Sequence, residues 1–414
     1  MKAILVHPPQ QPIRAVIRLA ASKSESNRAL IINALTDFQS ELTNISEARD
    51  SQTMQRLLAS TDPTADVIDA GTTMRFLTAY YALTGQSKRM TGTPRMCERP
   101  IGLLVDALRT LGARISYEQK EGYPPLLLEG FSYSGVAEVS LRGDVSSQYI
   151  SALLMVAPTL PQGLTIRLEG EVGSRPYIEM TLQQMAQFGI SYDANWNAKT
   201  IQVPAQSYQP TAYAIESDWS GASYWYSLVA LADDAEVELL GLKKNSLQGD
   251  SAIVDIMSHL GVQSTFTDRG VLLQKTEAAP AIGWDFTDCP DLAQTVAVCC
   301  AMKNIYLSMT GVESLKIKET DRIYALQQEL QKLGAELTEV EPNHRYEVKR
   351  VRETTPDQPA SIHTYDDHRM AMAFAPAGMR APVIIEEPGV VVKSYPGFWE
   401  DLGQVTTWEE LQLS

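Results

Sequence analysis

A recurring pattern around glycine constrains the fold of this 414-residue chain more than any other feature. Four times, an amphipathic helical stretch ends in a hydrophobic residue, a glycine and another apolar residue, and two short strands follow. The glycines are Gly112, Gly189, Gly261 and Gly334, which lie 77, 72 and 73 residues apart. Glycine ends helices because it adopts the left-handed conformation at little cost. Four matches at nearly equal spacing predict a structural repeat of roughly 70 residues.

The copy around Gly112 shows the pattern most clearly. Apolar residues at helical spacing precede the glycine: Ile101, Leu104, Val105, Leu108 and Leu111. Two predicted strands follow at 114–118 and 126–129, with a turn at 122–125 between them. A repeat of this size fits the chain about six times, which predicts two domains of three repeats, with a seam near residues 216–218. The first repeat looks shortened around residues 57–70.

Charge and cysteine content exclude several classes of protein. The formal net charge is −15, and no long basic run offsets it, so a general nucleic-acid binder or a protein that binds anionic membranes is not expected. No apolar stretch reaches the roughly 18 residues that would span a bilayer. The cysteines form neither a CxxC pair nor a zinc-spaced set, which favours a reducing cytoplasm; they are Cys97, Cys289, Cys299 and Cys300.

The segments before the repeated helices carry polar and basic residues. They lie at 97–100, 174–176, 248–250 and 318–322. Pro100 and Pro176 suit the first position of a helix, where a missing N–H costs nothing. A helix N-terminus attracts anions through its free N–H groups and its partial positive charge. If the repeats stack in parallel, these helix starts face one side of each domain and make it anion-selective.

Three further helix starts fit two interpretations each. Residues 22–28, 69–75 and 144–149 combine hydroxyl groups with Lys, Arg, Gly or Gln. Each segment is either an ordinary capped helix or a phosphate or carboxylate site. The chain has no Walker P-loop and no GxG, which removes the usual nucleotide-binding fingerprints.

Two more segments combine cations with carboxylates. Lys318 and Arg322 are expected on one helical face, where like charges at this spacing repel by about 0.2–0.5 kcal/mol unless an anion binds. Glu319 between them could transfer a proton. Residues 365–372 place two carboxylates before His368 and Arg369, without the second ligand group that a metal site needs. Both segments also fit ordinary salt-bridged helices.

Taken in chain order, these segments resemble one family over nearly the whole sequence. The matching residues are SKSESNRAL at 22–30, AGTTMRFL at 70–77, PRMCERPIG at 94–102, VSSQY at 145–149, SRPYIE at 174–179, PD at 290–291, KETDR at 318–322, DHRMAM at 367–372 and Lys393 in VVKSYP. The set resembles the 5-enolpyruvylshikimate-3-phosphate synthases, a family of enolpyruvyl transferases. Any one segment is modest evidence, whereas the ordered set is highly specific.

The resemblance implies both a fold and a reaction. The fold is α/β, with two inside-out domains of three βαβαββ repeats each and the active site in the interdomain cleft. One domain would contain residues 1–21 with 218–414, and the other 22–217. The reaction transfers the enolpyruvyl group of phosphoenolpyruvate to shikimate 3-phosphate through a tetrahedral intermediate, and it needs no cofactor and no metal. We expect a cytoplasmic monomer.

The resemblance also assigns site residues. Those that would bind phosphoenolpyruvate are Lys23, Gly71, Arg99, Gln148, Arg322, Arg369 and Lys393. Those that would bind shikimate 3-phosphate are Ser24, Arg28, Ser146, Ser147, Ser174, Tyr177, Asp291 and Lys318. Asp291 would accept the proton of the attacking hydroxyl, and Glu319 with Lys23 would deliver a proton to the methylene carbon.

Several positions depart from the family pattern, among them Ala20 and Ala21, which stand where Pro-Gly often precedes the SKS segment. Asp69 stands where Asn is frequent, and Phe76 stands where Pro is common. Both bear on inhibition by glyphosate, which is common in the family. Ser314 stands where an Asn often contacts the substrate.

Two alternatives lead to different functions. A transferase acting on UDP-N-acetylglucosamine shares the fold, but Cys97 lies only two residues before Arg99, too close for that family's longer cysteine loop. A non-catalytic binding homologue would be expected to lose proton-transfer residues, whereas Asp291, Glu319 and Lys23 are intact.

Overall fold

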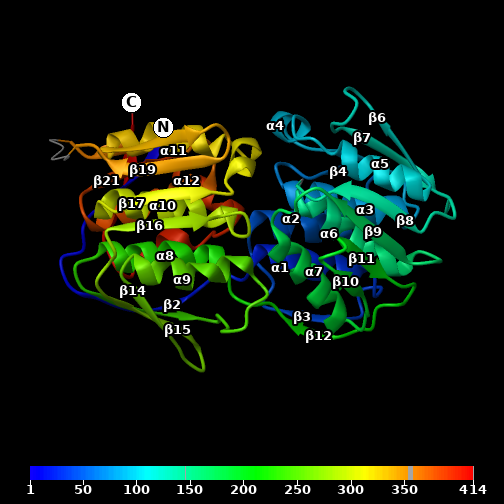
Figure 1. The fold of residues 1–414 in the computed structure, drawn as a ribbon, viewed down its shortest axis with the longest axis horizontal. Helices are drawn as coiled ribbons and strands as arrows, with labels where there is room; N and C mark the ends of the chain where they lie inside the picture. The colour runs from blue at the N-terminus through cyan, green and yellow to red at the C-terminus, as the bar shows by residue number, and fades with distance from the viewer. Residues whose placement is uncertain (145, 353–357, 414) are drawn as a thin grey trace. The chain divides into compact units, whose positions relative to one another are not determined.

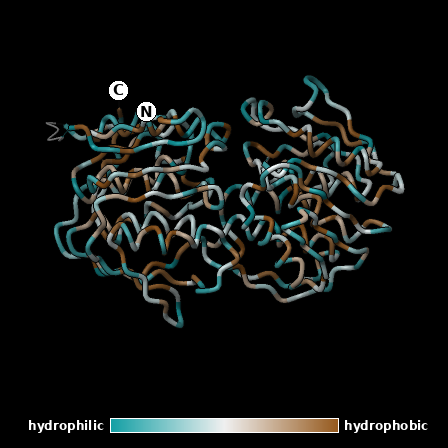
Figure 2. Tube along the Cα trace, viewed as in Figure 1, coloured by the Kyte–Doolittle hydropathy of each residue, from teal (hydrophilic) through white to brown (hydrophobic). Residues whose placement is uncertain are grey.

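The chain forms two compact units. The computed structural model describes residues 1–144, 146–352 and 358–413. Unit 1 comprises Met1–Ala20 and Glu216–Ser414, and unit 2 comprises Ala21–Ile215 (Figure 1). Each unit has its own cluster of buried hydrophobic residues. Hydrophobic and hydrophilic stretches alternate along the trace of both units (Figure 2).

A single strand-pairing scheme recurs through the molecule and confirms the predicted repeat. Within the described residues, five sheets have four strands each. Every one is a βαβαββ repeat in which strands one and two are parallel, while strands two and four, and four and three, are antiparallel. The strands therefore lie in the order one, two, four, three across each sheet.

Unit 2 contains two complete repeats and one reduced repeat. The first complete repeat is β4 (Thr64–Asp66), α3 (Gly71–Leu83), β5 (Lys88–Thr91), α4 (Pro94–Cys97), α5 (Gly102–Leu111), β6 (Ala113–Tyr117) and β7 (Leu126–Phe131). The second is β8 (Glu138–Arg142), α6 (Ser147–Val156), β9 (Leu164–Glu169), α7 (Arg175–Gln187), β10 (Asp193–Asn195) and β11 (Thr200–Val203). The reduced repeat pairs β12 (Ala212–Ala214) with β3 (Glu41–Thr43) and includes α1 (Lys23–Ala34) and α2 (Arg49–Leu58). Within the fully described stretch 41–70, α2 leads to β4 without a hairpin, which confirms the predicted shortening.

Unit 1 contains three repeats, and the first residues of the chain complete two of them. One repeat is β2 (Ile13–Arg18), α8 (Trp219–Leu231), β13 (Ala235–Leu240), α9 (Ile253–His259), β14 (Val262–Phe266) and β15 (Gly270–Lys275). The next is β16 (Ala281–Asp285), α10 (Ala293–Lys303), β17 (Tyr306–Thr310), α11 (Arg322–Lys332), β18 (Ala335–Glu341) and β19 (Arg345–Arg350). The last is β20 (Ala360–Ile362), α12 (His368–Phe374), β21 (Val383–Glu386), α13 (Phe398–Leu402), β22 (Trp408–Gln412) and β1 (Lys2–Val6).

The four repeat glycines end helices as predicted. Gly112, Gly189, Gly261 and Gly334 have φ values of 111°, 84°, 92° and 79°, in the left-handed region. At Gly112 the requirement is also steric, because an added Cβ would lie 1.9 Å from the carbonyl oxygen of Ser132. The chain can therefore turn from α5 into β6 only with glycine at this position.

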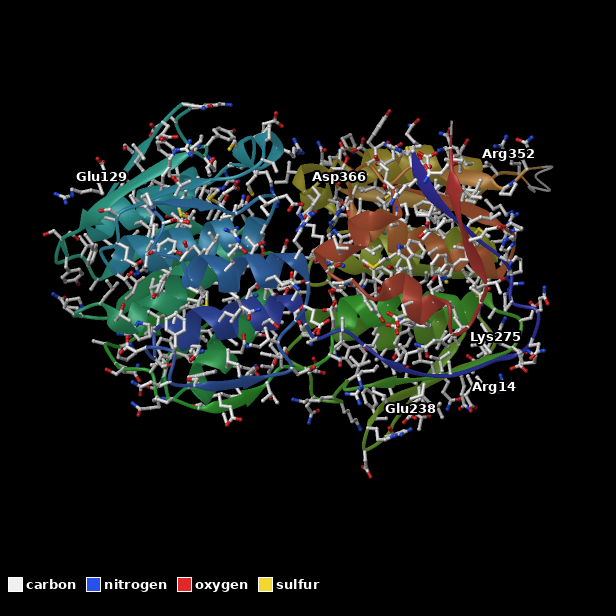
Figure 3. All side chains as sticks on the ribbon, turned by 180° about the vertical axis from the view of Figure 1, so that it is seen from behind. Arg14, Glu129, Glu238, Lys275, Arg352 and Asp366 are labelled. Atoms are coloured by element: carbon white, nitrogen blue, oxygen red, sulfur yellow. The ribbon has the colours of Figure 1, made fainter. Side chains whose placement is uncertain are left out.

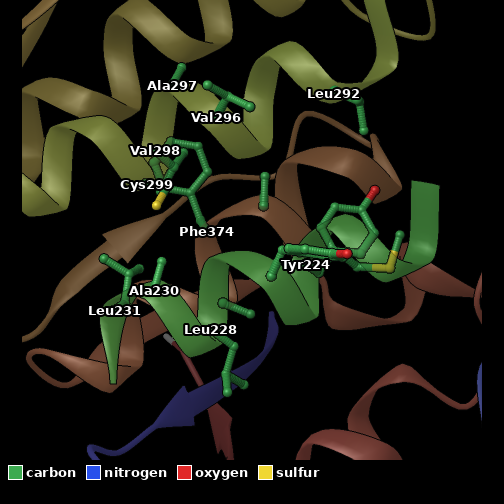
Figure 4. Packing of buried hydrophobic residues seen from close by; sticks show 14 of the residues in the cluster. Tyr224, Leu228, Ala230, Leu231, Leu292, Val296, Ala297, Val298, Cys299 and Phe374 are labelled. Atoms are coloured by element: carbon green, nitrogen blue, oxygen red, sulfur yellow. The ribbon is translucent and has the colours of Figure 1, made fainter. Parts of the chain in front are cut away.

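Helices lie inside and sheets outside, as the predicted fold class requires. Apart from Ser220, every residue of α8 is buried, and α12 is buried throughout. A helix that is apolar all round belongs in a core, and Figure 4 shows Val298 and Cys299 of α10 packed beside Phe374 of α12. The strands alternate instead; β13 has buried residues at every second position. In Figure 3 the charged side chains of Arg14 and Glu129 project outward from strands.

Two details of the helix starts differ from the sequence predictions. Pro100 does not occupy the first position of α5, which begins at Gly102. Lys318 and Arg322 do not share a helical face, because α11 begins at Arg322 and Lys318 is extended (φ −83°, ψ −152°). Asp321 is the N-cap residue of α11 and accepts a hydrogen bond from the Tyr324 N–H at 3.0 Å. This cap ends helical geometry on its N-terminal side.

Candidate active site

A buried guanidinium group organises the charged cluster of unit 1. Arg322, the first residue of α11, has a side chain that is 2% exposed. Its Nε donates to Asp367 at 2.7 Å, its Nη1 to Asp291 at 3.0 Å and its Nη2 to Glu319 at 2.9 Å. Burial alone would lower the pKa of Arg322, but the three carboxylates raise it well above its usual value. Arg322 therefore stays charged and fixes three carboxylates around one plane.

Asp291 connects this guanidinium to a second one. It lies in the short 3-10 helix Pro290–Leu292, directly before α10. Its Oδ2 accepts from Arg369 Nη2 at 2.9 Å, while its Oδ1 accepts from Arg322. Burial would raise the pKa of Asp291, but the charges of Arg369, Lys318 and Arg322 hold it below its usual value. At neutral pH Asp291 is thus an ionised acceptor.

Capping of α12 and a nearby lysine complete the cluster. Asp367 is the N-cap of α12, and its Oδ1 accepts from the backbone N–H of Arg369 at 2.8 Å. The guanidinium of Arg369 also lies 3.4 Å from the Tyr224 hydroxyl. Lys393, whose side chain is 2% exposed, places its Nζ 3.4 Å from Glu319 Oε1. The start of α12 therefore aims Arg369 at Asp291, and Lys393 faces Glu319.

A second group of predicted site residues lies in unit 2, at the start of α3. Arg75 Nη1 donates to the carbonyl oxygen of Gly71 at 3.0 Å. A Cβ added to Gly71 would lie 2.8 Å from Arg99 Nη1, so the Arg99 guanidinium lies against the backbone there. Gln148 Nε2 donates to the Thr72 hydroxyl at 3.0 Å. Gly71, Arg99 and Gln148, predicted separately from three segments, converge on one helix N-terminus.

Lys23 lies at the start of α1 and pairs with a carboxylate that the sequence did not single out. Its Nζ lies 3.1 Å from Asp50 Oδ2, and the Asp50 side chain is 3% exposed. Ser22 caps α1 by accepting from the Glu25 N–H at 3.3 Å. The backbone oxygen of Asp50 accepts from the Thr73 hydroxyl at 3.3 Å, which ties Lys23 to α3.

Arg28 is held by hydroxyl and carbonyl groups. Its Nε donates to Thr181 Oγ1 at 2.7 Å and its Nη1 to the Ser24 carbonyl at 2.9 Å. Its Nη2 contacts Ser151 Oγ at 3.3 Å and the Tyr177 carbonyl at 3.2 Å. Burial lowers the pKa of Arg28 to about 10. Arg28 thus links α1, α6 and α7 and positions Ser24 and Tyr177.

The remaining predicted residues of unit 2 lie at helix starts. Ser146 caps α6, since its Oγ accepts from the Gln148 N–H at 3.3 Å, and Ser147 is the buried first residue of that helix. Ser174 is the N-cap residue of α7 and has a φ of 52°. Cys97 ends α4 and is half-buried, with its Sγ 3.7 Å from the Gly92 carbonyl oxygen.

Sequence reasoning missed several charged and polar residues that hold the predicted ones. Asp50, Asp367 and Tyr224 contact Lys23, Arg322 and Arg369 as described above. Asp250 is a buried carboxyl that bonds to the Ser220 hydroxyl. Burial, followed by the nearby charge of Asp291, raises its pKa to about 7. Asp250 and Asp367 lie in segments that the sequence did single out, at 248–250 and 365–372, although neither was assigned a role there.

Comparison with known proteins points to one family. The family described as "EPSP synthase (3-phosphoshikimate 1-carboxyvinyltransferase)" matches residues 8–62 and 56–402. A 3-phosphoshikimate 1-carboxyvinyltransferase of Bacteroides fragilis is 49% identical over 97% of both chains. One of Shigella flexneri is 37% identical, over 96% of this chain and 98% of its own. A solved EPSP synthase from Acinetobacter baumannii is similar in fold, with a TM-score of 0.80 and 19% identity over both whole chains. This chain belongs to the EPSP synthase family.

Proposed function

We propose that the protein transfers the carboxyvinyl group of phosphoenolpyruvate to shikimate 3-phosphate and releases inorganic phosphate. The observation that carries this proposal is the ionised Asp291 carboxylate held between the guanidinium groups of Arg322 and Arg369. Such a group is fixed in place to accept a proton, while the adjacent cations attract an anionic substrate. The names of the relatives support the same reaction.

The proposed chemistry has an addition step and an elimination step. In the addition, the attacking hydroxyl of shikimate 3-phosphate bonds to C2 of phosphoenolpyruvate and gives its proton to Asp291. Glu319, with Lys23, delivers a proton to the methylene carbon, which becomes a methyl group. In the elimination, the C–O bond to phosphate breaks, the leaving phosphate takes the proton held by Asp291, and Glu319 takes a proton back from the methyl group, so both carboxyl groups return to their starting states. The products are the enolpyruvyl ether and phosphate, and no cofactor is consumed.

Substrate binding would adjust the proton affinity of Asp291. In the free protein, Arg369 and Arg322 keep the pKa of Asp291 low, which makes it a weak base. An anionic substrate that pairs with Arg322, Arg369 and Lys393 would offset part of their positive charge. The pKa of Asp291 would then rise towards the working pH, where proton acceptance is effective.

The proposed site draws residues from both units. The phosphoenolpyruvate residues are Lys23, Gly71, Arg99 and Gln148 of unit 2 with Arg322, Arg369 and Lys393 of unit 1. Those for shikimate 3-phosphate are Ser24, Arg28, Ser146, Ser147, Ser174 and Tyr177 of unit 2 with Asp291 and Lys318 of unit 1. We propose that 1–21 with 218–414 and 22–217 are the two catalytic domains. Neither should turn over the substrates alone.

Phosphate release tests the function directly. The purified protein is incubated with phosphoenolpyruvate and shikimate 3-phosphate, and each substrate is omitted in turn. We expect release only when both are present. Release with UDP-N-acetylglucosamine in place of shikimate 3-phosphate would favour the related transferase. No release with either acceptor would indicate a non-catalytic homologue.

The setting of the protein is also a proposal. Among the described residues, none of the helices is both long and apolar enough to cross a membrane. The cysteine pattern suits a reducing compartment, so we propose a cytoplasmic protein that acts on small anions as a monomer. Light scattering coupled to gel filtration would test the monomer, since a dimer would double the mass of 45.7 kDa.

A further inference from the structure

A carboxylate lies where the anion-binding end of α3 should be most positive. Asp69 stands two residues before Gly71, at which α3 begins. The first N–H groups of a helix attract anions, and a negative side chain beside them competes with an anionic ligand. Asp69 therefore opposes the charge of Arg99, which lies against the same backbone.

Arg49 offsets this carboxylate from a locally unfavourable position. Its Nη2 lies 2.8 Å from Asp69 Oδ2. Arg49 is the first residue of α2, where a cation is disfavoured by the helix dipole. The helix itself gives no reason for an arginine there, whereas the carboxylate of Asp69 does.

The charges around the start of α3 fall into two ion pairs and two further cations. Arg49 pairs with Asp69, and the adjacent Asp50 pairs with Lys23. The guanidinium groups of Arg75 and Arg99 would both lie within 2.8 Å of a Cβ at Gly71. While Arg49 neutralises Asp69, the charges of Arg75 and Arg99 remain in full at Gly71; without Arg49, the Asp69 carboxylate would cancel the charge of one of them.

We propose that Arg49 and Asp69 are positioning residues that set the affinity of unit 2 for phosphoenolpyruvate. The pair keeps the Asp69 charge away from the incoming carboxylate and phosphate without touching the substrate. This inference rests on the proposed function for its substrate. The electrostatic effect itself applies to any phosphate-bearing anion bound at the start of α3.

A stability role does not account for the pair. The side chains of Arg49 and Asp69 are 39% and 26% exposed. Ion pairs with this exposure contribute little to folding, because water already solvates both charges. An uncompensated charge near a bound anion has a larger effect on the binding affinity than such an ion pair has on folding stability, since the anion must be desolvated to bind.

Charge-changing variants test the proposal. Arg49→Gln should raise the KM for phosphoenolpyruvate about 10-fold, and leave kcat and the KM for shikimate 3-phosphate within about 2-fold. Asp69→Asn should leave the KM for phosphoenolpyruvate unchanged or lower it. The double variant should match Asp69→Asn, because it has no charge left to offset. Arg49→Lys, which keeps the charge, should recover most of the wild-type affinity.

A matched control separates a local effect from a general loss of positive charge. Arg167→Gln breaks an exposed pair with Glu138 on β8 and β9 of the same unit, where the two side chains are 3.1 Å apart. It should leave both KM values unchanged. The proposal is overturned if Arg49→Gln leaves the KM for phosphoenolpyruvate unchanged. It is equally overturned if both KM values rise together with a fall in Tm, or if the double variant is weaker than Arg49→Gln.

Phosphate binding keeps this test independent of the proposed reaction. The Kd of inorganic phosphate is measured for the full-length wild type and for each variant, by phosphorus NMR. Arg49→Gln should weaken phosphate binding by a similar factor, and Asp69→Asn should not. If the Kd values follow this pattern but the wild type releases no phosphate from the two substrates, the proposed reaction is refuted and the Arg49–Asp69 inference is retained. A Kd unaffected by Arg49→Gln would refute the inference alone.

Discussion

Arg322 of unit 1 and Arg28 of unit 2 are both buried but are held by different kinds of acceptor. In unit 1, Arg322 donates to the carboxylates of Asp367, Asp291 and Glu319. In unit 2, Arg28 donates to two hydroxyl and two carbonyl groups. The pKa of Arg322 is raised accordingly, and that of Arg28 is lowered by burial. Carboxylates position Arg322 and can also carry protons, whereas neutral groups position Arg28, and we expect its positive charge to attract an anion.

The largest effect is expected where the carboxylate network meets the reaction. Asp291→Asn removes the proton acceptor but keeps its size, so kcat should fall about 10²–10⁴-fold. Steady-state phosphate release measures it, with a thermal melt to verify folding. Asp234→Asn, at an exposed ion pair with Arg14, is the control and should keep full activity. A kcat within about 3-fold of wild type for Asp291→Asn would show that the carboxylate of Asp291 is not the proton acceptor.

The same substitution in both units tests the comparison itself. Arg322→Met leaves buried carboxylates without their cation, which should cost about 3–5 kcal/mol of unfolding free energy. Arg99 is half-buried, so Arg99→Met should cost less than about 1 kcal/mol of unfolding free energy and instead weaken phosphoenolpyruvate binding. Denaturant unfolding and KM measurements separate the two outcomes. Equal losses of stability would show that both arginines are structural anchors.

A carboxyl in unit 1 that bonds to a hydroxyl instead of a guanidinium should respond to pH. The pKa of Asp250 is raised to about 7 in the native state, whereas the ordinary pKa of an aspartate in the unfolded chain is near 4. Between these two pH values the native state keeps a proton that the unfolded chain has lost. Wild-type stability should therefore fall as pH rises from about 4 to about 7. Asp250→Asn removes this loss of stability at high pH. The gain in unfolding free energy of the variant over the wild type should therefore be roughly 1–3 kcal/mol larger at pH 8 than at pH 5. Denaturant unfolding at both pH values measures it.

A control variant makes the Asp250 experiment specific. Asp255 is exposed on α9 of the same unit. Asp255→Asn should leave the pH dependence of stability as it is in the wild type. If Asp250→Asn also leaves it unchanged, the Asp250 carboxyl is ionised in the native protein, and the unit 1 carboxylates do not differ in their proton affinity.

The smallest effect is expected at the backbone of unit 2. Gly71→Ala introduces a Cβ 2.8 Å from Nη1 of both Arg75 and Arg99. Because these atoms end flexible side chains, the fold should persist while the guanidinium groups shift, and the KM for phosphoenolpyruvate should rise about 5–10-fold. Gly85→Ala, which meets nothing within 4 Å but has a φ of 74°, should cost only stability. An unchanged KM for phosphoenolpyruvate in Gly71→Ala would contradict the proposal that Arg99 binds this substrate.

Local signals made the repeat and its helix starts predictable from the sequence. Gly112 and its three counterparts mark helix ends because their backbone conformation excludes other residues. Ser22 and Ser146 cap helices through bonds to residues two or three positions away. Such features depend on residues that are close in the sequence, so they can be predicted from the sequence alone.

Contacts between distant segments were beyond that reasoning. Lys23 and Asp50 are 27 positions apart, and Arg322 and Asp367 are 45 apart. The predicted helical face joining Lys318 and Arg322 is wrong because the Asp321 cap starts α11 at Arg322. The segment adopts an extended conformation at Lys318, with Lys318 and Arg322 both close to Asp291.

The first 20 residues are synthesised well before the strands with which they pair. β2 pairs with residues 235–240, and β1 pairs with residues 383–386 and 408–412. Residues 21–215 form a unit with its own core and can fold while synthesis continues. β1 must wait, with unpaired edges, until residues 383–386 and 408–412 emerge, whereas β2 can pair once residues 235–240 have emerged. We expect a released chain truncated after about residue 230 to hold a protease-resistant unit 2 and a protease-sensitive N-terminus.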